Sequence, residues 1–126
     1  LLLGHLLLKK KLPDQAMPHL ETACNINNKS GLAYRMKGEI HLGKKHPGKA
    51  GFEFNKAIKL NPSDAVSLSG YAESMALQGK NLNIALTFAT NSVALEPDNK
   101  LFKKRLKAIL KKIDEVSVSN EKIKTA

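Results

Sequence analysis

The chain has 126 residues, of which 42% are hydrophobic and 25% charged, an ordinary composition for one soluble globular domain. Its 21 Lys and Arg against 11 Asp and Glu give a net charge of +10. The composition argues against a collagen-like fibre, a disulfide scaffold and a chain disordered throughout, and it favours a binding module over an enzyme. The single cysteine, Cys24, excludes an internal disulfide and a cysteine-based zinc site.

The excess positive charge is lysine, with 19 Lys against 2 Arg. Lysine is a hydrated point charge, whereas arginine is the better planar ligand for phosphates and bases. The chain has no Trp, two Tyr and four Phe, so base stacking is poorly supplied. We therefore do not expect a nucleic-acid partner and interpret the lysines as a solubilising helical surface.

The chain opens with the apolar and basic residues 1–11, LLLGHLLLKKK. This stretch is shorter than the roughly 20 apolar residues that span a membrane. It also lacks the basic-before-apolar order of a signal peptide. Because Leu1 is not a methionine, we expect the chain to be a piece of a longer protein. The compartment stays open, with the cytoplasm preferred to the periplasm.

An internal repeat divides the chain into residues 1–30, 31–64 and 65–99. Small residues recur at steps of 34 or 35: Gly4, Gly38 and Ala72 form one series, and Ala16, Ala50 and Ala85 form another. Each copy reads as a helix, a short turn and a second helix. In chain order, the turns within repeats fall near Pro13, at 44–48 and at 80–83.

The second copy shows most clearly why small residues recur. Two helices of a hairpin approach closely only where one side offers little volume. Gly38 on the first helix, with Ala50 and Ala57 on the second, predicts such a crossing, and Tyr34 and Phe54 fill the space beside it. At the boundaries, Ser30 and either Ser63 or Asp64 are expected N-caps.

Residues 100–113 predict a terminal capping helix. Phe102, Leu106, Ile109 and Ile113 form an apolar stripe at helical spacing, and lysines cover the rest. With seven basic residues and no acid, a membrane-surface helix is the alternative interpretation, which we do not prefer. Residues 114–126 are polar and weakly patterned, so we expect a flexible tail there.

The repeats resemble the tetratricopeptide repeat, whose pattern places an aromatic, Gly, Ala, Phe, Ala and Pro at fixed offsets over 34 residues. The second copy carries that pattern in Tyr34, Gly38, Ala50, Phe54, Ala57 and Pro62. The resemblance implies an all-α fold: an α-solenoid of antiparallel helix hairpins in a right-handed superhelix, about seven helices in all. Residues 1–113 would form this single domain.

No residue set predicts catalysis, a cofactor or a metal. The chain lacks a glycine-rich phosphate loop, an HExxH motif and a GxSxG motif. Cys24 lies beside the packing position Ala23 and is expected to be an inert thiol. His41 and His46 are five residues apart, which is poor metal geometry. We therefore expect a protein that is not an enzyme.

In the resembled family, the first helices of the repeats line a concave groove that holds a peptide or protein segment. The matching positions in this chain are His5, Lys9, Arg35, Glu39, Leu42, Ser69, Glu73, Leu77 and Arg105. Arg35 and Glu39 are also i, i+4 neighbours, so they are candidates to pair with each other. The mixture of charge and leucine suits an extended peptide better than a small substrate.

One subgroup of the family grips the carboxylate end of chaperone tails with lysines, asparagines and an arginine. The matching positions here hold Leu1, His5, Met36, Val66 and Gly70. In a register shifted by one repeat they hold Arg35, Glu39, Gly70, Leu101 and Arg105. Neither set supplies the donors that a carboxylate needs, so we expect no tight binding of acidic tails.

The leading function is therefore a non-enzymatic scaffold or adaptor module that binds a protein or peptide. The alternative is a regulatory or substrate-docking segment of a larger enzyme, such as a glycosyltransferase or sulfotransferase. Self-association is a further expectation, because the truncated first helix carries Leu1, Leu2, Leu3, Leu6, Leu7 and Leu8.

Overall fold

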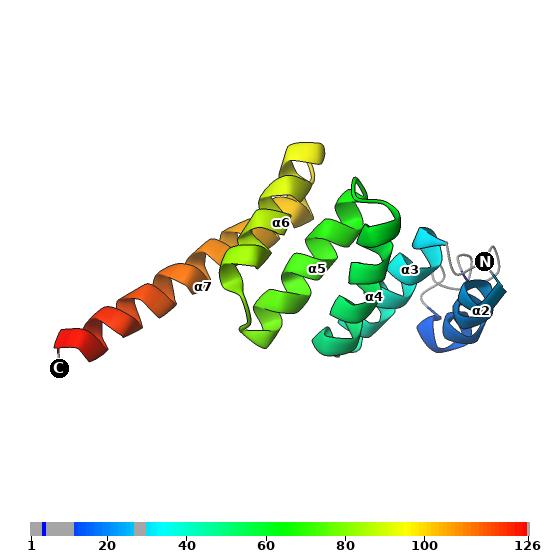
Figure 1. The fold of residues 1–126 in the computed structure, drawn as a ribbon, viewed down its shortest axis with the longest axis horizontal. Coiled ribbons are helices and arrows are strands. Elements are labelled where there is room, and N and C mark those ends of the chain that lie inside the picture. The colour runs from blue at the N-terminus through cyan, green and yellow to red at the C-terminus, as the bar shows by residue number, and fades with distance from the viewer. Residues whose placement is uncertain (1–3, 5–11, 27–29, 126) are drawn as a thin grey trace.

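A computed structural model describes residue 4, residues 12–26 and residues 30–125, with side chains up to residue 120. Over these residues the chain forms six α-helices and no strand (Figure 1). They are α2 (Pro13–Ile26), α3 (Gly31–Gly43), α4 (Pro47–Leu60), α5 (Ala65–Gln78), α6 (Leu82–Leu95) and α7 (Lys100–Thr125). The first helix expected from the sequence falls on residues outside this description, apart from Gly4, which is helical.

Local sequence signals explain where the helices begin and end. Pro47 occupies the start of α4, where its missing N–H is not needed. Ser30 caps α3 and Asp64 caps α5; the Ser67 amide and hydroxyl both donate to the Asp64 carboxylate, at 3.4 and 2.9 Å. Helix α5 ends at Gly79, whose φ of 67° favours glycine.

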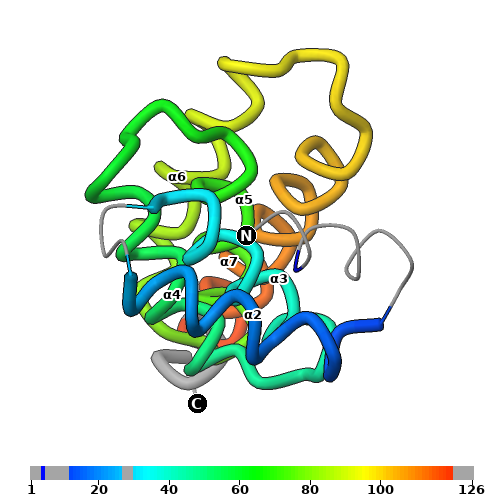
Figure 2. Tube along the Cα trace, turned by 90° about the vertical axis from the view of Figure 1, so that its right-hand side faces the viewer, coloured from blue at the N-terminus to red at the C-terminus, as the bar shows by residue number. Residues whose placement is uncertain are grey.

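Consecutive helices pack against each other as stacked hairpins, giving an α-solenoid (Figure 1). Figure 2 shows the stack from the end that carries α2. The buried apolar residues form three clusters along the stack instead of one central core. Each hairpin therefore covers the next, as the repeat pattern predicted.

The recurring small residues are buried at the helix crossings, as expected. Ala50 and Ala57 of α4 are both 0% exposed, and Gly38 of α3 lies against the ring of Phe54. A Cβ at Gly38 would lie 2.9 Å from that ring, which is closer than Cβ contacts occur. Gly70 of α5 is tighter still, because a Cβ there would lie 2.4 Å from Phe54 Cζ. Phe54 is thus held between two glycines.

The last helix packs the predicted stripe against the stack, with Phe102 at 2% and Ile109 at 0% exposure and with Leu106 and Ile113 half-buried. The expected boundary at residue 113 is wrong, because α7 continues through the segment predicted as a flexible tail and ends at Thr125. No Gly or Pro follows Lys100, so the sequence contains no stop signal. The C-terminal half of α7 extends away from the stack (Figure 1).

Of the helices that the structure describes, none combines the length with the apolar character that crossing a bilayer requires.

Candidate functional site

Two adjoining hollows lie where α3, α5 and α7 face one another, and together we call them the α3–α5–α7 groove. Their volumes are about 570 and 330 Å³. They share Leu42, Leu101 and Arg105, so they are two stretches of one depression. The larger is also lined by Glu39, Gly43, Phe54, Val66, Asn99 and Phe102, and the smaller by Glu73, Leu77, Lys104 and Ala108.

Helical spacing explains why these side chains gather on one side. Residues three and four apart lie on the same face of a helix. On α3 the groove takes Glu39 and Leu42, and on α5 it takes Glu73 and Leu77. On α7, residues 101, 105 and 108 follow the same rule. Each helix therefore presents one mixed apolar and charged stripe to the groove.

Arg35 lies one helical turn before Glu39 on α3 and is held by Asp64, the N-cap of α5. Its Nη1 donates to both carboxylate oxygens of Asp64, at 3.2 and 3.4 Å. The expected partner Glu39 is farther away, with 4.0 Å between Arg35 Nε and Glu39 Oε1. Arg35 Nε itself is buried without a hydrogen-bond acceptor. Arg35 therefore links α3 to the start of α5 more than it neutralises Glu39.

Arg105 lies at the junction of the two hollows and is fixed from α5. Its Nη1 donates to Ser69 Oγ at 3.0 Å, and its Nε lies 3.8 Å from Glu73 Oε2. Ser69 is fully buried, so the hydrogen bond anchors the guanidinium from beneath. Arg105 is thus held in one orientation before any ligand arrives.

Burial shifts the ionisation of two groove residues. It raises the pKa of the Glu39 carboxyl, and Asp64 acts in the same direction while Arg35 and Arg105 oppose the rise. Burial also lowers the pKa of Arg105, against the effect of Glu73 and Glu39. In both cases partial removal from water disfavours the charged form. The groove therefore surrounds its charges with less water than an open helix face does.

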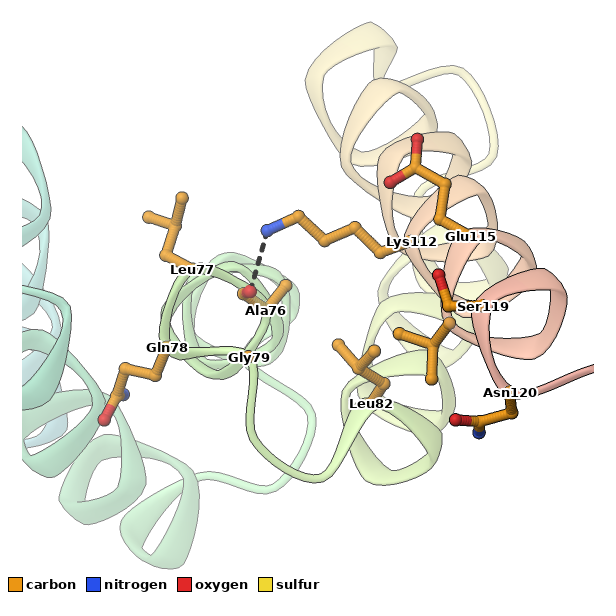
Figure 3. Close-up of a pocket in the computed structure, with 10 residues that line it drawn as sticks. Ala76, Leu77, Gln78, Gly79, Leu82, Lys112, Glu115, Ser119 and Asn120 are labelled. Carbon is orange, nitrogen blue, oxygen red and sulfur yellow. Dashed lines mark hydrogen bonds between the residues drawn. The ribbon is translucent and has the colours of Figure 1, made fainter. Parts of the chain in front are cut away.

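A third hollow of about 460 Å³ adjoins the groove through Leu77 and follows the extended part of α7 (Figure 3). Lys112 Nζ donates to the carbonyl oxygen of Ala76 at 2.7 Å, near the C-terminal end of α5. Its further lining residues are Gln78, Gly79, Leu82, Glu115, Val116, Ser119 and Asn120. We call it the α5–α7 hollow.

Of the nine residues predicted to line the groove, the structure places some in it and others outside it. Five of them line the α3–α5–α7 groove: Glu39, Leu42, Glu73, Leu77 and Arg105. Arg35 and Ser69 line neither of its hollows and instead anchor other groups. His5 and Lys9 lie outside the described residues, as do the leucines at 1–3 and 6–8 proposed for self-association.

Sequence reasoning missed most of the contribution of α7. Leu101, Lys104 and Ala108 line the groove, and Lys112 and Val116 line the α5–α7 hollow. The spacing of residues 101, 105, 108 and 112 marks one helix face and could have identified it. Interpreting α7 only as a cap hid this second face.

Outside the groove, the cysteine and a histidine that could carry chemistry have their ionisation shifted by burial. Cys24 is 7% exposed, and burial raises the pKa of its thiol, which disfavours the reactive thiolate. Burial lowers the pKa of His41. Within residues 12–26 and 30–120, no three His, Cys, Asp or Glu side chains are grouped so that they could hold a metal ion.

Three structures of other proteins share this fold. The first domain of Spaghetti (RPAP3), solved with the HSP90 peptide SRMEEVD, has a TM-score of 0.79 and 18% identity over 88% of this chain and 87% of that chain. The second such domain of human RPAP3, solved with the HSP70 peptide SGPTIEEVD, has a TM-score of 0.74 and 20% identity, covering 84% and 88%. The Arabidopsis OM64 domain has a TM-score of 0.78 and 18% identity, covering 86% and 88%.

The search of curated proteins gives no significant match. The family model described as "Tetratricopeptide repeat" matches residues 1–30 and 33–64, which are the first two repeats identified in the sequence. Together with the stacked hairpins and their buried small residues, this match shows that the chain belongs to the tetratricopeptide repeat family.

Proposed function

We propose that the chain is a non-enzymatic protein-interaction module that binds a peptide or protein segment in the α3–α5–α7 groove. The observation that carries this proposal is the groove's apolar surface between fixed charges. Leu77 and Leu101 are each 51% exposed although they lie in a depression, and Leu42 of α3 lines the same hollow. Covering such side chains removes apolar area from water, worth about 25 cal/mol per Å².

The dimensions favour a segment over a small molecule. From Leu101 to Ser119, α7 lines the groove and the α5–α7 hollow along a path of about 27 Å, at 1.5 Å per residue. An extended peptide covers that distance with about eight residues. We call the groove and the α5–α7 hollow together the channel. Binding along a preformed channel needs little reorganisation of the protein.

Two of the similar folds are known in complex with chaperone tail peptides, which supports a peptide ligand for this chain. The residues at the positions that grip chaperone tails in one subgroup of the family favour a different kind of peptide in this chain. Met36 is 2% exposed and Gly70 lies against Phe54, so neither offers a donor to a terminal carboxylate. Arg105 is already held by Ser69 and Glu73. We therefore propose a ligand other than an acidic tail.

Peptides selected from a random display library on the full chain provide the test. Leu42→Asp and Leu101→Asp each place a charge on the apolar surface and should weaken the selected peptides by about tenfold or more. Ile84→Asp is the matched control, because Ile84 is 48% exposed on α6, outside the groove. Fluorescence anisotropy gives the affinities. Unchanged binding in both groove variants, with melting temperatures preserved, would refute the proposed site.

A further inference from the structure

Two of the cations that line the groove and the α5–α7 hollow are already hydrogen-bonded to this chain. Arg105 donates to Ser69 at 3.0 Å. Lys112 donates to the Ala76 carbonyl at 2.7 Å (Figure 3). Lys104 differs, because it is an exposed side chain at the rim of the smaller hollow. Of the three cations that line these hollows, two are therefore anchored by a hydrogen bond to this chain.

The carboxylates of the same channel are not committed in this way. Glu39, Glu73 and Glu115 each line a hollow, and none accepts a hydrogen bond from a residue that the structure describes. Glu39 and Glu73 lie 4.0 and 3.8 Å from the nearest arginine nitrogens, which are ion-pair distances without a hydrogen bond. Among the charged groups anchored in the groove and the α5–α7 hollow, the carboxylates therefore accept from a ligand more readily than Arg105 and Lys112 donate to it.

The apolar side chains stand next to these acceptors. Glu39 lies one helical turn from Leu42 on α3, and Glu73 lies one turn from Leu77 on α5. Both leucines line the smaller hollow together with Leu101. A ligand that fills the hollow with an apolar side chain thus brings its neighbouring residues within reach of a carboxylate.

We propose that the groove selects peptide segments in which a lysine or arginine accompanies apolar side chains, and that it discriminates against acidic segments. This proposal rests on the proposed function of the groove. A basic side chain supplies the hydrogen-bond donors that Glu39 and Glu73 lack, and the pairing is charge-assisted. An acidic side chain meets the two carboxylates and one arginine, Arg105, which is already hydrogen-bonded to Ser69. The selectivity arises from which charged groups are left without a hydrogen-bond partner.

The overall charge of the protein makes this preference distinguishable from nonspecific attraction. The chain carries a net charge of +10, so its long-range field favours acidic peptides. A preference for basic peptides runs against that field and requires local contacts. Raising the salt concentration screens the long-range attraction more than contacts within a partly desolvated groove.

Random twelve-residue peptides displayed on phage can be selected in parallel on the full chain and on two double variants. The first variant is Glu39→Gln with Glu73→Gln, which removes both groove carboxylates at nearly constant shape. The matched control is Glu21→Gln with Glu96→Gln, which changes net charge equally at exposed positions outside the groove. Thermal melts confirm that each variant is folded before selection.

On the wild type and the control, we expect Lys and Arg to be enriched over Asp and Glu by about 3- to 5-fold beside enriched apolar residues. On the groove double variant, the basic enrichment should disappear while the apolar enrichment remains. Apolar enrichment without basic enrichment on the wild type would overturn the charge proposal and leave the groove function standing. If no peptide is enriched on any of the proteins, the proposed function itself fails.

Discussion

Gly70→Ala is the substitution that most directly probes the packing between repeats. The new Cβ would lie 2.4 Å from Phe54 Cζ, whereas ordinary contact begins at 3.4 Å, so the ring must retreat by about 1 Å. Phe54 is 1% exposed and is bounded on its other side by Gly38, so it has little room to move. Overpacking of this kind costs about 1–3 kcal/mol.

The helix itself favours the substitution, because alanine is better than glycine in a helix interior by about 1 kcal/mol. Since the clash is severe, we expect the upper part of the overpacking range and a net loss of about 2 kcal/mol in the free energy of unfolding. That loss corresponds to a fall of roughly 6–10 °C in Tm for a domain of this size. Urea denaturation measures the free energy directly.

Gly43→Ala is the matched control, since nothing lies within 4 Å of a Cβ at that helical position. It should be neutral or stabilising by up to about 1 kcal/mol. In a Phe54→Leu background the cost of Gly70→Ala should shrink, because the ring is absent. Equal stability of Gly70→Ala and Gly43→Ala would refute the view that Phe54 is wedged between two glycines.

Three further substitutions test other contacts. Ala57→Leu adds volume at a site with 0% exposure and should lower the free energy of unfolding by about 1–3 kcal/mol, and an unchanged urea midpoint would contradict this. Asp64→Ala removes the α5 cap and the partner of Arg35, so we expect a loss of about 1–2 kcal/mol, also by urea denaturation; wild-type stability would show that the cap contributes nothing. Glu39 has a raised pKa in the folded state, so its ionised form disfavours folding. Glu39→Gln should therefore stabilise the protein at pH 7, and the gain should vanish as the pH falls below about 4; a gain that is the same at both pH values would contradict the assignment.

The fold was predictable because the same pattern recurs in three repeats along the chain. A single small residue predicts a helix crossing only weakly, but its recurrence at steps of 34 and 35 residues makes the prediction specific. The role of Gly70 escaped this reasoning, because Phe54 reaches it from the preceding repeat. The end of α7 escaped as well, since polar residues without Gly or Pro extend a helix as readily as they form a tail.

The site was predictable only at the level of helix faces. The family resemblance assigned Leu42, Leu77 and Arg105 to a groove, and in the structure these three residues line the α3–α5–α7 groove. It could not choose between competing partners for a charge. Arg35 donates to Asp64, 29 residues away, in preference to its helical neighbour Glu39, because the cap of α5 brings that carboxylate closer. Such choices depend on three-dimensional distances that spacing along the chain does not contain.

The central claim is that a peptide lies between α3, α5 and α7, and backbone NMR on the full chain tests it most directly. A peptide selected from the display library is titrated into the ¹⁵N-labelled protein, and amide shift changes are mapped onto the helices. We predict the largest changes on α3 near Leu42, on α5 near Leu77 and on α7 near Leu101. Changes concentrated on α4 and α6 would contradict the account.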